Sequence, residues 1–258
     1  MKVIKHNLPD FETLHILPLA DPHIGDIHSD FKKLQQELDI IKNSENTYTI
    51  LNGDLVDMAV RSSIGDIYGQ NLTPMKALEQ CVKIFGPISD KCLAVNPGNH
   101  ELRVWRTDGI DVTQMLCHEL GIADRYSNAS SLIFVRFGAH ARSSQHHRPV
   151  MYSIYCTHGA GGGRTEGAKV KRLADLAAIV DADVFIHSHT HLPVIFKEKF
   201  YRINPGNSSV QAVDKLFVNT GSTMEYGGYG ELQSYKPNSM DTPIIHLSGT
   251  ERRLSATL

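Results

Sequence analysis

The sequence contains no stretch that is long and apolar enough to cross a membrane as a helix. A spanning helix needs about 20 consecutive apolar residues, and every apolar run in this chain is much shorter. The N-terminal residues Met1–His6 also lack the apolar core of a secretory signal peptide. These absences predict a cytoplasmic protein with no membrane partner.

Cysteine and net charge are scarce as well. The four cysteines have no C-x-x-C spacing, and we expect buried, reduced thiols. A formal charge of −2 does not indicate a surface that coats nucleic acid, although it is compatible with a local basic patch. No internal repeat or linker-like segment divides the 258 residues, so we expect residues 1–258 to form a single α/β domain.

Short apolar runs rich in Val, Ile and Tyr recur along the chain and are typical of buried strands. Five of these runs lead directly into polar residues. The runs are 14–20, 48–52, 92–95, 152–156 and 184–186, and the polar segments that follow them are Asp21-Pro22-His23, Gly53-Asp54, Gly98-Asn99-His100-Glu101, His158 and His187-Ser188-His189-Thr190-His191. Because ligands of open α/β sheets bind beyond the carboxyl ends of the strands, we expect the five segments to converge.

Amphipathic patterns alternate with these strands and predict helices over 30–42, 73–85, 111–120 and 167–180. After His191 the pattern changes to two strands, 194–203 and 209–218, and a last strand over 243–247. Strand–helix alternation followed by hairpins predicts an α/β fold in which two β-sheets pack together and helices cover the outside.

The polar residues at the strand ends are suitable ligands for divalent cations. Asp21 and His23 are two residues apart, so in an extended segment both point to the same side, and His189 and His191 share this spacing. Asp54 follows a glycine that permits a tight turn, and its two oxygens can bridge two ions. The set is too large for one ion and predicts a site for two.

The order of the motifs resembles the calcineurin-like metallophosphoesterase superfamily, in its bacterial and phage-type members. The motifs are Asp21-x-His23, Gly53-Asp54-x-x-Asp57, Gly98-Asn99-His100-Glu101, His158 and Ser188-His189-x-His191, within about residues 13–221. One departure is Ser188, where the family usually has glycine. The resemblance implies a two-sheet β-sandwich flanked by helices, in four α/β/β/α layers, which agrees with the layers predicted from the pattern.

The resemblance also implies a ligand set for each of two divalent metal ions. One ion would be held by Asp21, His23, Asp54 and His191, and the other by Asp54, Asn99, His158 and His189. Mn²⁺ is the first choice for activity, and Fe, Zn²⁺, Ni²⁺ and Co²⁺ also suit Asp, Asn and His ligands. A hydroxide held between the ions would attack the phosphorus of a phosphoester substrate in line.

Two further residues resemble catalytic residues of the family. His100 resembles a histidine that binds no metal, contacts the phosphate and protonates the leaving oxygen. Asp57 resembles its partner, which orients the imidazole ring and favours its charged form. The alternatives are a structural hydrogen bond for His100 and, for Asp57, a cap at the start of a helix over residues 58–61.

Three arginines are candidates for binding the phosphate of a substrate. Arg103 and Arg106 lie just after His100, and Arg164 lies beyond His158. An arginine fork suits a pair of phosphate oxygens, and the alternative is a surface salt bridge.

Two other features are interpreted more simply. Residues 138–149, rich in arginine and histidine, are expected to form a mobile surface loop, with a basic lip beside the site as the alternative. His187 faces the same way as the two histidines that follow it, and we interpret it as a buried, hydrogen-bonded residue and not as a ligand.

Three functions remain open. A phosphodiesterase or nuclease acting on nucleotides or nucleic acid is favoured by the bacterial and phage-type resemblance and by the basic segment 138–149. A phosphomonoesterase or protein phosphatase is second, because that group places Arg-Gly where this chain has Met58-Ala59. A metal-bearing scaffold without activity would be expected to lack a ligand or His100, and the sequence retains them all.

Overall fold

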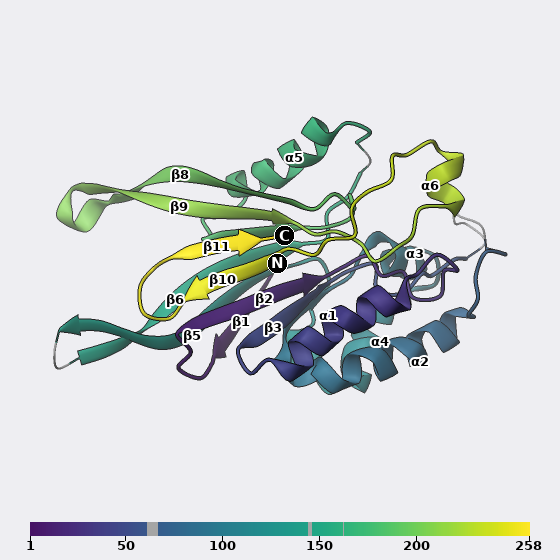
Figure 1. Cartoon of the computed structure of the whole chain (residues 1–258), viewed down its shortest axis with the longest axis horizontal. Helices are drawn as coiled ribbons and strands as arrows, with labels where there is room; N and C mark the ends of the chain where they lie inside the picture. Colours follow the sequence, from purple (N-terminus) through teal and green to yellow (C-terminus); the bar gives the residue numbers. More distant parts are fainter. Residues whose placement is uncertain (61–66, 144–145, 162) are drawn as a thin grey trace.

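The strands of the protein form two mixed β-sheets that pack face to face, with helices on both outer sides (Figure 1). The computed structural model describes residues 1–60, 67–143, 146–161 and 163–258, with the backbone alone for residues 139–143, 146–148 and 229. The four-layer arrangement confirms the fold class that the sequence predicts.

Within the described residues one sheet has six strands and the other has five. The larger sheet has the order β1 (Lys2–Asn7), β5 (Ser130–Ser143), β6 (His146–Thr157), β7 (Val184–His187), β9 (Ser209–Asn219) and β8 (Val194–Asn204). The smaller sheet has the order β11 (Leu254–Thr257), β10 (Ile244–Ser248), β2 (Thr13–Leu19), β3 (Thr47–Asn52) and β4 (Cys92–Asn96). Strands β2, β3 and β4 are parallel, and so are β6, β7 and β9, which brings their carboxyl ends to one edge of each sheet.

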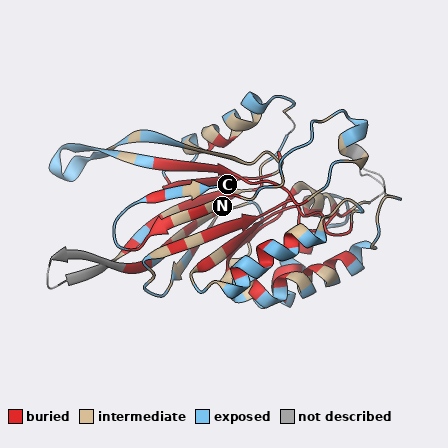
Figure 2. Ribbon diagram, viewed as in Figure 1, coloured by how far each residue is buried: buried red, intermediate tan, exposed pale blue. Residues whose placement is uncertain are grey.

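The main core lies between the two sheets and is apolar. It contains Ile16 of β2, Ile50 of β3, Ile154 of β6 and Val218 of β9, all fully buried. The inner strands are therefore almost continuously buried toward the carboxyl end, as Figure 2 shows. Strands buried in this way are expected to have short apolar runs, which is the pattern of the sequence.

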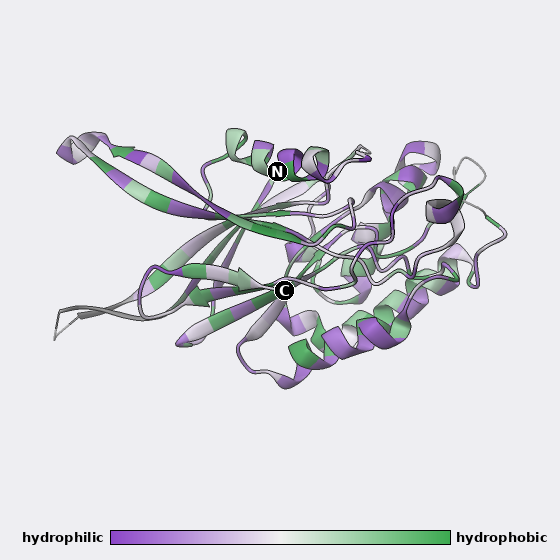
Figure 3. Cartoon of the chain, turned by 45° about the horizontal axis from the view of Figure 1, so that its top comes forward, coloured by the Kyte–Doolittle hydropathy of each residue, from purple (hydrophilic) through white to green (hydrophobic). Residues whose placement is uncertain are grey.

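Helices cover the outer face of each sheet. Helices α1 (Phe31–Asn43), α2 (Pro74–Phe85) and α4 (Val112–Glu119) pack on the five-stranded sheet, and α5 (Glu166–Asp175) packs on the other. Hydrophobic and hydrophilic residues alternate around these helices (Figure 3). The remaining helices are α3 (Asn99–Asp108), α6 (Gly228–Leu232) and short 3₁₀ turns at Gly86–Lys91, Ala123–Arg125, Leu176–Ala178 and Pro205–Asn207.

The predicted boundaries of α1, α2, α4 and of strands β2, β3, β4, β7 and β10 agree with the structure to within about a residue. The sequence did not predict β1, β5, β11, the first part of β6, or helices α3 and α6. No helix among the described residues is long and apolar enough to cross a membrane. The four cysteines are buried and free, as expected.

The expectation of a loop over residues 138–149 was wrong for the residues that the structure describes there, 138–143 and 146–149. The backbone there continues β5 and β6, which pair as an antiparallel hairpin. This segment lies at the start of β6, whereas His158 follows the end of that strand. At 3.3 Å per residue the strand spans roughly 35 Å, so the backbone of the segment is remote from the strand ends and forms no lip beside the site. The side chains of His140, His146 and His147 lie outside the described residues.

Candidate metal centre

The five polar segments of the sequence come together at the carboxyl ends of the strands. Asp21 and His23 follow β2, Asp54 follows β3, Asn99 and His100 begin α3, His158 follows β6, and His189 and His191 follow β7. Asp21, Asp54 and His158 are almost completely buried, at 0%, 2% and 2% exposure. Buried carboxylates and imidazoles at this density need partners of opposite charge.

The backbone brings these side chains together in a way that the sequence analysis did not foresee. Asp21, His23, Asp54, His189 and His191 all have positive φ values, between 45° and 67°. The expected extended geometry, with alternate residues on one side, was wrong for both the 21–23 and the 189–191 pairs. Left-handed backbone costs energy for residues other than glycine, and it clusters at functional sites where the surrounding structure enforces it.

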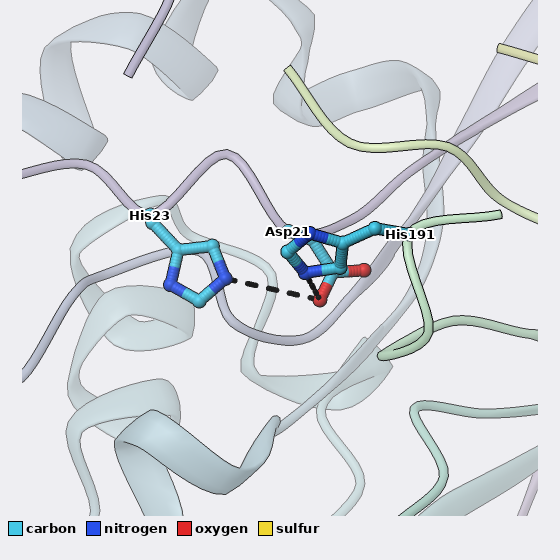
Figure 4. Close-up of side chains that lie close together, drawn as sticks. All are labelled: Asp21, His23 and His191. Carbon is cyan, nitrogen blue, oxygen red and sulfur yellow. Dashed lines mark hydrogen bonds and ion pairs between the residues drawn. The ribbon is translucent and has the colours of Figure 1, made fainter. Parts of the chain in front are cut away.

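The first ligand cluster consists of Asp21, His23 and His191. Both imidazoles point toward the Asp21 carboxylate (Figure 4). The His191 Nε2 atom lies 3.1 Å from Asp21 Oδ1, and His23 Nε2 lies 3.9 Å from the same oxygen. The backbone N–H of His189 donates to the other Asp21 oxygen at 3.1 Å. The carboxylate is therefore held by one histidine segment and faces two imidazoles.

The second ligand cluster consists of Asp54, His158 and His189. His158 Nε2 lies 3.2 Å from Asp54 Oδ2 and 3.3 Å from Asn99 Oδ1. The other ring nitrogen of His158 donates to the backbone carbonyl of Asn52 at 2.8 Å. That hydrogen bond fixes the tautomer and leaves Nε2 facing the carboxylate, as in histidines that bind metal.

The residues present fit divalent metal ions. His23 Nε2 is buried without a hydrogen-bond partner, although it lies 3.8 Å from Asp54 Oδ2. A buried polar atom of this kind costs free energy unless something binds it. Asp54 belongs to the second cluster and also groups with His23 and His100. Each cluster offers carboxylate oxygen and imidazole nitrogen, which are ligands of Mn²⁺, Fe and Zn²⁺.

The charges of the site shift the pKa values of its members strongly. Burial alone would lower the pKa of His158, but Asp54 and Asp21 raise it to about 10. Burial likewise opposes the charged form of His23, and Asp57, Asp54 and Asp21 raise its pKa to about 9. In the metal-free protein, protons on His23 and His158 therefore balance the charge of the carboxylates. Binding of metal cations would release these protons.

His100 and Asp57 lie beside the Asp54 carboxylate. The backbone N–H of His100 donates to Asp54 Oδ1 at 2.8 Å, and His100 Nε2 lies 3.9 Å from Asp54 Oδ2. His100 Nδ1 contacts Asp57 Oδ1, and Gln70 donates to the other Asp57 oxygen at 2.6 Å. Burial would raise the pKa of Asp57, but its contacts with His100 and His23 lower it. An ionised Asp57 thus orients the His100 ring.

The alternative for Asp57, a helix cap, is wrong for the part that the structure describes, because residues 58–60 are not helical. Residue 61 lies outside the described residues. Asp57 also lies 3.4 Å from His23 Nδ1, so it contacts two imidazoles of the site.

Glu101 is an important residue to which the sequence analysis gave no role. Its carboxylate is 3% exposed and accepts backbone N–H groups of Asp54, Leu55 and Val56 at 3.1, 2.7 and 3.0 Å and that of Gly98 at 2.8 Å. It joins the loop after β3 to the start of α3. The available signal was a glutamate three residues after Gly98, the spacing of a helix N-terminal cap.

Glycines allow these two loops to approach closely. A Cβ atom on Gly98 would lie 2.1 Å from Asp54 Oδ1, and one on Gly53 would lie 2.5 Å from the backbone nitrogen of Gly98. Both contacts are far inside van der Waals distance. The close approach of Asp54 to the start of α3 therefore depends on glycine at both places.

Arg103 is half-buried, whereas Arg106 and Arg164 are exposed. Arg103 is one helical turn beyond His100 on α3, and its Nη1 donates to the carbonyl of Met58 at 3.4 Å. Arg106 is exposed on the same helix. Arg164 is exposed too, with its guanidinium 5.7 Å from the centre of the Tyr235 ring.

His187 is buried at 3% exposure, and its Nδ1 is 2.8 Å from Asn219 Oδ1. A Cβ atom on Gly159 would lie 2.1 Å from its Nε2 atom, so the ring packs against that backbone. This geometry agrees with the interpretation of His187 as a buried, hydrogen-bonded residue.

Comparison with known proteins identifies the family. The family model described as calcineurin-like phosphoesterase matches residues 23–193, more than half of the chain. The chain therefore belongs to the calcineurin-like phosphoesterase family. No curated protein matches it in sequence.

The solved structures that match this chain share little sequence with it. Vacuolar Protein Sorting 29 from Cryptosporidium parvum is 10% identical, covers 96% of this chain and 98% of its own, and has a TM-score of 0.45. A predicted phosphoesterase from Streptococcus pneumoniae is 12% identical, with coverages of 95% and 90% and a TM-score of 0.39. A metallophosphoesterase from Sphaerobacter thermophilus is 12% identical, with coverages of 93% and 90% and a TM-score of 0.37. At these TM-scores the likenesses add nothing to the family assignment.

Proposed function

We propose that the protein is a phosphodiesterase with two metal ions that hydrolyses phosphodiester bonds of nucleotides or nucleic acid. The observation that carries the proposal is the position of Asp54. This one carboxylate belongs to the second ligand cluster, lies 3.8 Å from His23 of the first, and lies 3.9 Å from His100. Metal ligands and a proton donor therefore surround a single point.

The proposed ligands follow from the two clusters. One ion would be held by Asp21, His23, Asp54 and His191, and the other by Asp54, Asn99, His158 and His189. When bound, two divalent ions supply positive charge for the phosphoryl oxygens and lower the pKa of water. We propose Mn²⁺ for activity.

The protein itself supplies the proton for the leaving group. His100 is 21% exposed, so its Nε2 atom is within reach of a substrate, while Nδ1 is held by the ionised Asp57. A charged imidazole in this position can give its Nε2 proton to the departing alkoxide oxygen. The Asp57 carboxylate then keeps the ring oriented in both of its protonation states.

The two segments that carry His100 and His158 also contain basic residues, which supports a diester substrate. Arg103 and Arg106 extend along α3 from His100, and Arg164 lies beyond His158 on the side of β6. A monoester at the end of a nucleotide has an anionic neighbour on one side only. A diester within a nucleotide chain has phosphates on both sides of it, which basic residues on two segments could contact. Guanidinium groups suit such phosphate oxygens.

We further propose that residues 1–258 act as one domain and that the protein works in the cytoplasm. The first proposal is supported by the core between the sheets, to which both Ile4 and Leu254 contribute. The second is supported by four buried free cysteines, the state expected in a reducing compartment.

The experiment is to strip the protein of metal, restore it with Mn²⁺, and measure turnover of bis-p-nitrophenyl phosphate and p-nitrophenyl phosphate side by side. Faster diester cleavage supports the proposal and leads to cyclic nucleotides and DNA as the next substrates. A strong preference for the monoester would replace it with a phosphatase. The absence of turnover of either ester with metal bound would contradict catalysis. His118→Ala, an exposed histidine on α4, is the control that should keep full activity.

A further inference from the structure

A buried polar network lies between the two sheets, directly beneath the candidate metal centre. It contains Asn52 at the end of β3, Asn96 at the end of β4, Ser131 on β5 and Ser188 just after β7, each of them 0% exposed. Polar groups in an otherwise apolar core are costly unless they are hydrogen-bonded to one another. The network therefore calls for an explanation beyond packing.

Asn52 is the centre of this network. Its side-chain Nδ2 donates to Ser188 Oγ at 2.7 Å and to the carbonyl of Thr157 at 2.9 Å. Its Oδ1 accepts from Asn96 Nδ2 at 2.8 Å. Its backbone carbonyl accepts from His158 Nδ1 at 2.8 Å. One residue of the smaller sheet is thereby bonded to the ends of two strands of the larger sheet.

The contacts of Asn52 coincide with one ligand cluster. Thr157 precedes His158, Ser188 precedes His189, and Asn52 itself lies two residues before Asp54. These three ligands form the second cluster. Asn52 thus joins the three backbone segments that carry that cluster.

The first cluster is held by different groups. The hydroxyl of Ser222 donates to the backbone carbonyl of Asp21 at 2.6 Å. His23 Nδ1 lies 3.4 Å from Asp57 Oδ1. The backbone N–H of His189 also donates to Asp21, but neither the Ser222 nor the Asp57 contact of the first cluster involves Asn52, so a change at Asn52 should act mainly on the second cluster.

We propose that Asn52 is a positioning residue that sets the geometry of the second metal position alone, acting through Ser188, Thr157 and the ring of His158. This inference rests on one part of the proposed function, the binding of two metal ions, and does not require that the protein cleaves a phosphodiester. It predicts that a substitution at Asn52 lowers the affinity for one metal ion and leaves the affinity for the other unchanged. Hydrogen bonds that orient metal ligands typically contribute about 10- to 100-fold to metal affinity.

The main test is Ser188→Ala, with Ser131→Ala as its matched control. Both serines are fully buried, and both hydroxyls make a 2.7 Å hydrogen bond to an asparagine of the network. Ser131 bonds to Asn96 and lies one step further from the ligands. Any general loss of stability should therefore be similar in the two variants, while the effect on metal should differ.

The measurement is a titration of the metal-free proteins with Mn²⁺, in which free Mn²⁺ is counted by its EPR signal. Ser188→Ala should bind one ion like the wild type and the other at least about tenfold more weakly, and Ser131→Ala should bind both normally. His189→Ala and His191→Ala, which remove a ligand from the second and first cluster, show which ion is affected. Asn52→Ala should resemble His189→Ala if it folds.

Two results would overturn the proposal. One is that Ser188→Ala binds both ions with unchanged affinity. The other is that its affinity for both ions falls by the same factor. Because the titration needs no substrate, it is independent of the assay of turnover. A protein that showed the selective loss of one ion but cleaved no phosphoester would refute the proposed function and leave the role of Asn52 intact.

Discussion

Replacing Glu101 with glutamine tests whether its carboxylate holds the metal-binding loops together. The carboxylate accepts four backbone N–H groups, two on each oxygen. A glutamine has nearly the same shape, but only its oxygen can accept. Its NH₂ group would face two N–H donors, so two hydrogen bonds are lost and like groups oppose each other.

The expected loss of stability follows from this geometry. A hydrogen bond to a charged acceptor contributes about 1.5–3 kcal/mol, so two of them contribute roughly 3–6 kcal/mol. Removing a buried charge offsets part of the loss, because burial and the nearby Asp54 raise the pKa of Glu101 and so disfavour its ionised form. We expect Glu101→Gln to lower the free energy of unfolding by about 2–4 kcal/mol.

The assay is urea unfolding of the metal-free proteins at pH 7, with Glu37→Gln as the control. Glu37 is buried to the same extent, at 3% exposure, but its carboxylate contacts only the Thr242 hydroxyl and, at 3.7 Å, Lys33. Burial raises the pKa of Glu37, so its ionised form costs stability above the unfolded pKa near 4.5. Glutamine should therefore be neutral or stabilising there at pH 7. Equal effects of the two substitutions, within about 1 kcal/mol, would refute the role given to Glu101.

Three further outcomes are expected at the metal centre. Asp54→Asn should lower the metal content at both positions, and an unchanged content by elemental analysis would rule out a shared ligand. His100→Ala should keep two ions yet lose about 10²- to 10⁴-fold in diester turnover; full turnover would mean that another group is the acid. Since the pKa values of His23 and His158 are raised to about 9 and 10, their charged forms stabilise the metal-free protein below about pH 6.5, and that contribution is lost as the pH rises through 9 to 10. Metal affinity should accordingly increase from pH 6 to pH 9, with proton release measurable by calorimetry in buffers of different ionisation enthalpy, and a pH-independent affinity would contradict these shifts.

The sequence predicted the strands that lead into the site and the residues that meet at their ends, because buried parallel strands have short apolar runs and their carboxyl ends share an edge. The roles of the ligands, of His100 and of the arginines stay predictions. Helix α3 was missed because its start, Gly98-Asn99-His100-Glu101, contains weak helix formers and the sequence was interpreted only as a source of ligands.

Other features depend on contacts that no local pattern encodes. The left-handed backbone of Asp21 and His191 arises where loops from different strands meet, and nothing in a two-residue spacing indicates it. The hydrogen-bond partners of Glu101 and Asn52 lie up to 47 and 136 residues away in the chain, respectively. The described part of the hairpin of β5 and β6 was mistaken for a loop because its segment is rich in arginine, histidine and serine and lacks the apolar alternation that is typical of strands.

The left-handed ligand residues have a consequence for how relatives of this protein change over time. At five positions the backbone is of the kind that glycine adopts freely, yet the chain has aspartate or histidine. Each such residue carries about 1 kcal/mol or more of strain, and the carboxylates and imidazoles crowd one another as well. Replacing a buried residue usually destabilises the fold. At these positions, substitution by glycine would relieve backbone strain and should destabilise the fold less. A lineage that no longer needed the metal would lose these residues readily, so their joint retention in a sequence is a record of continued use.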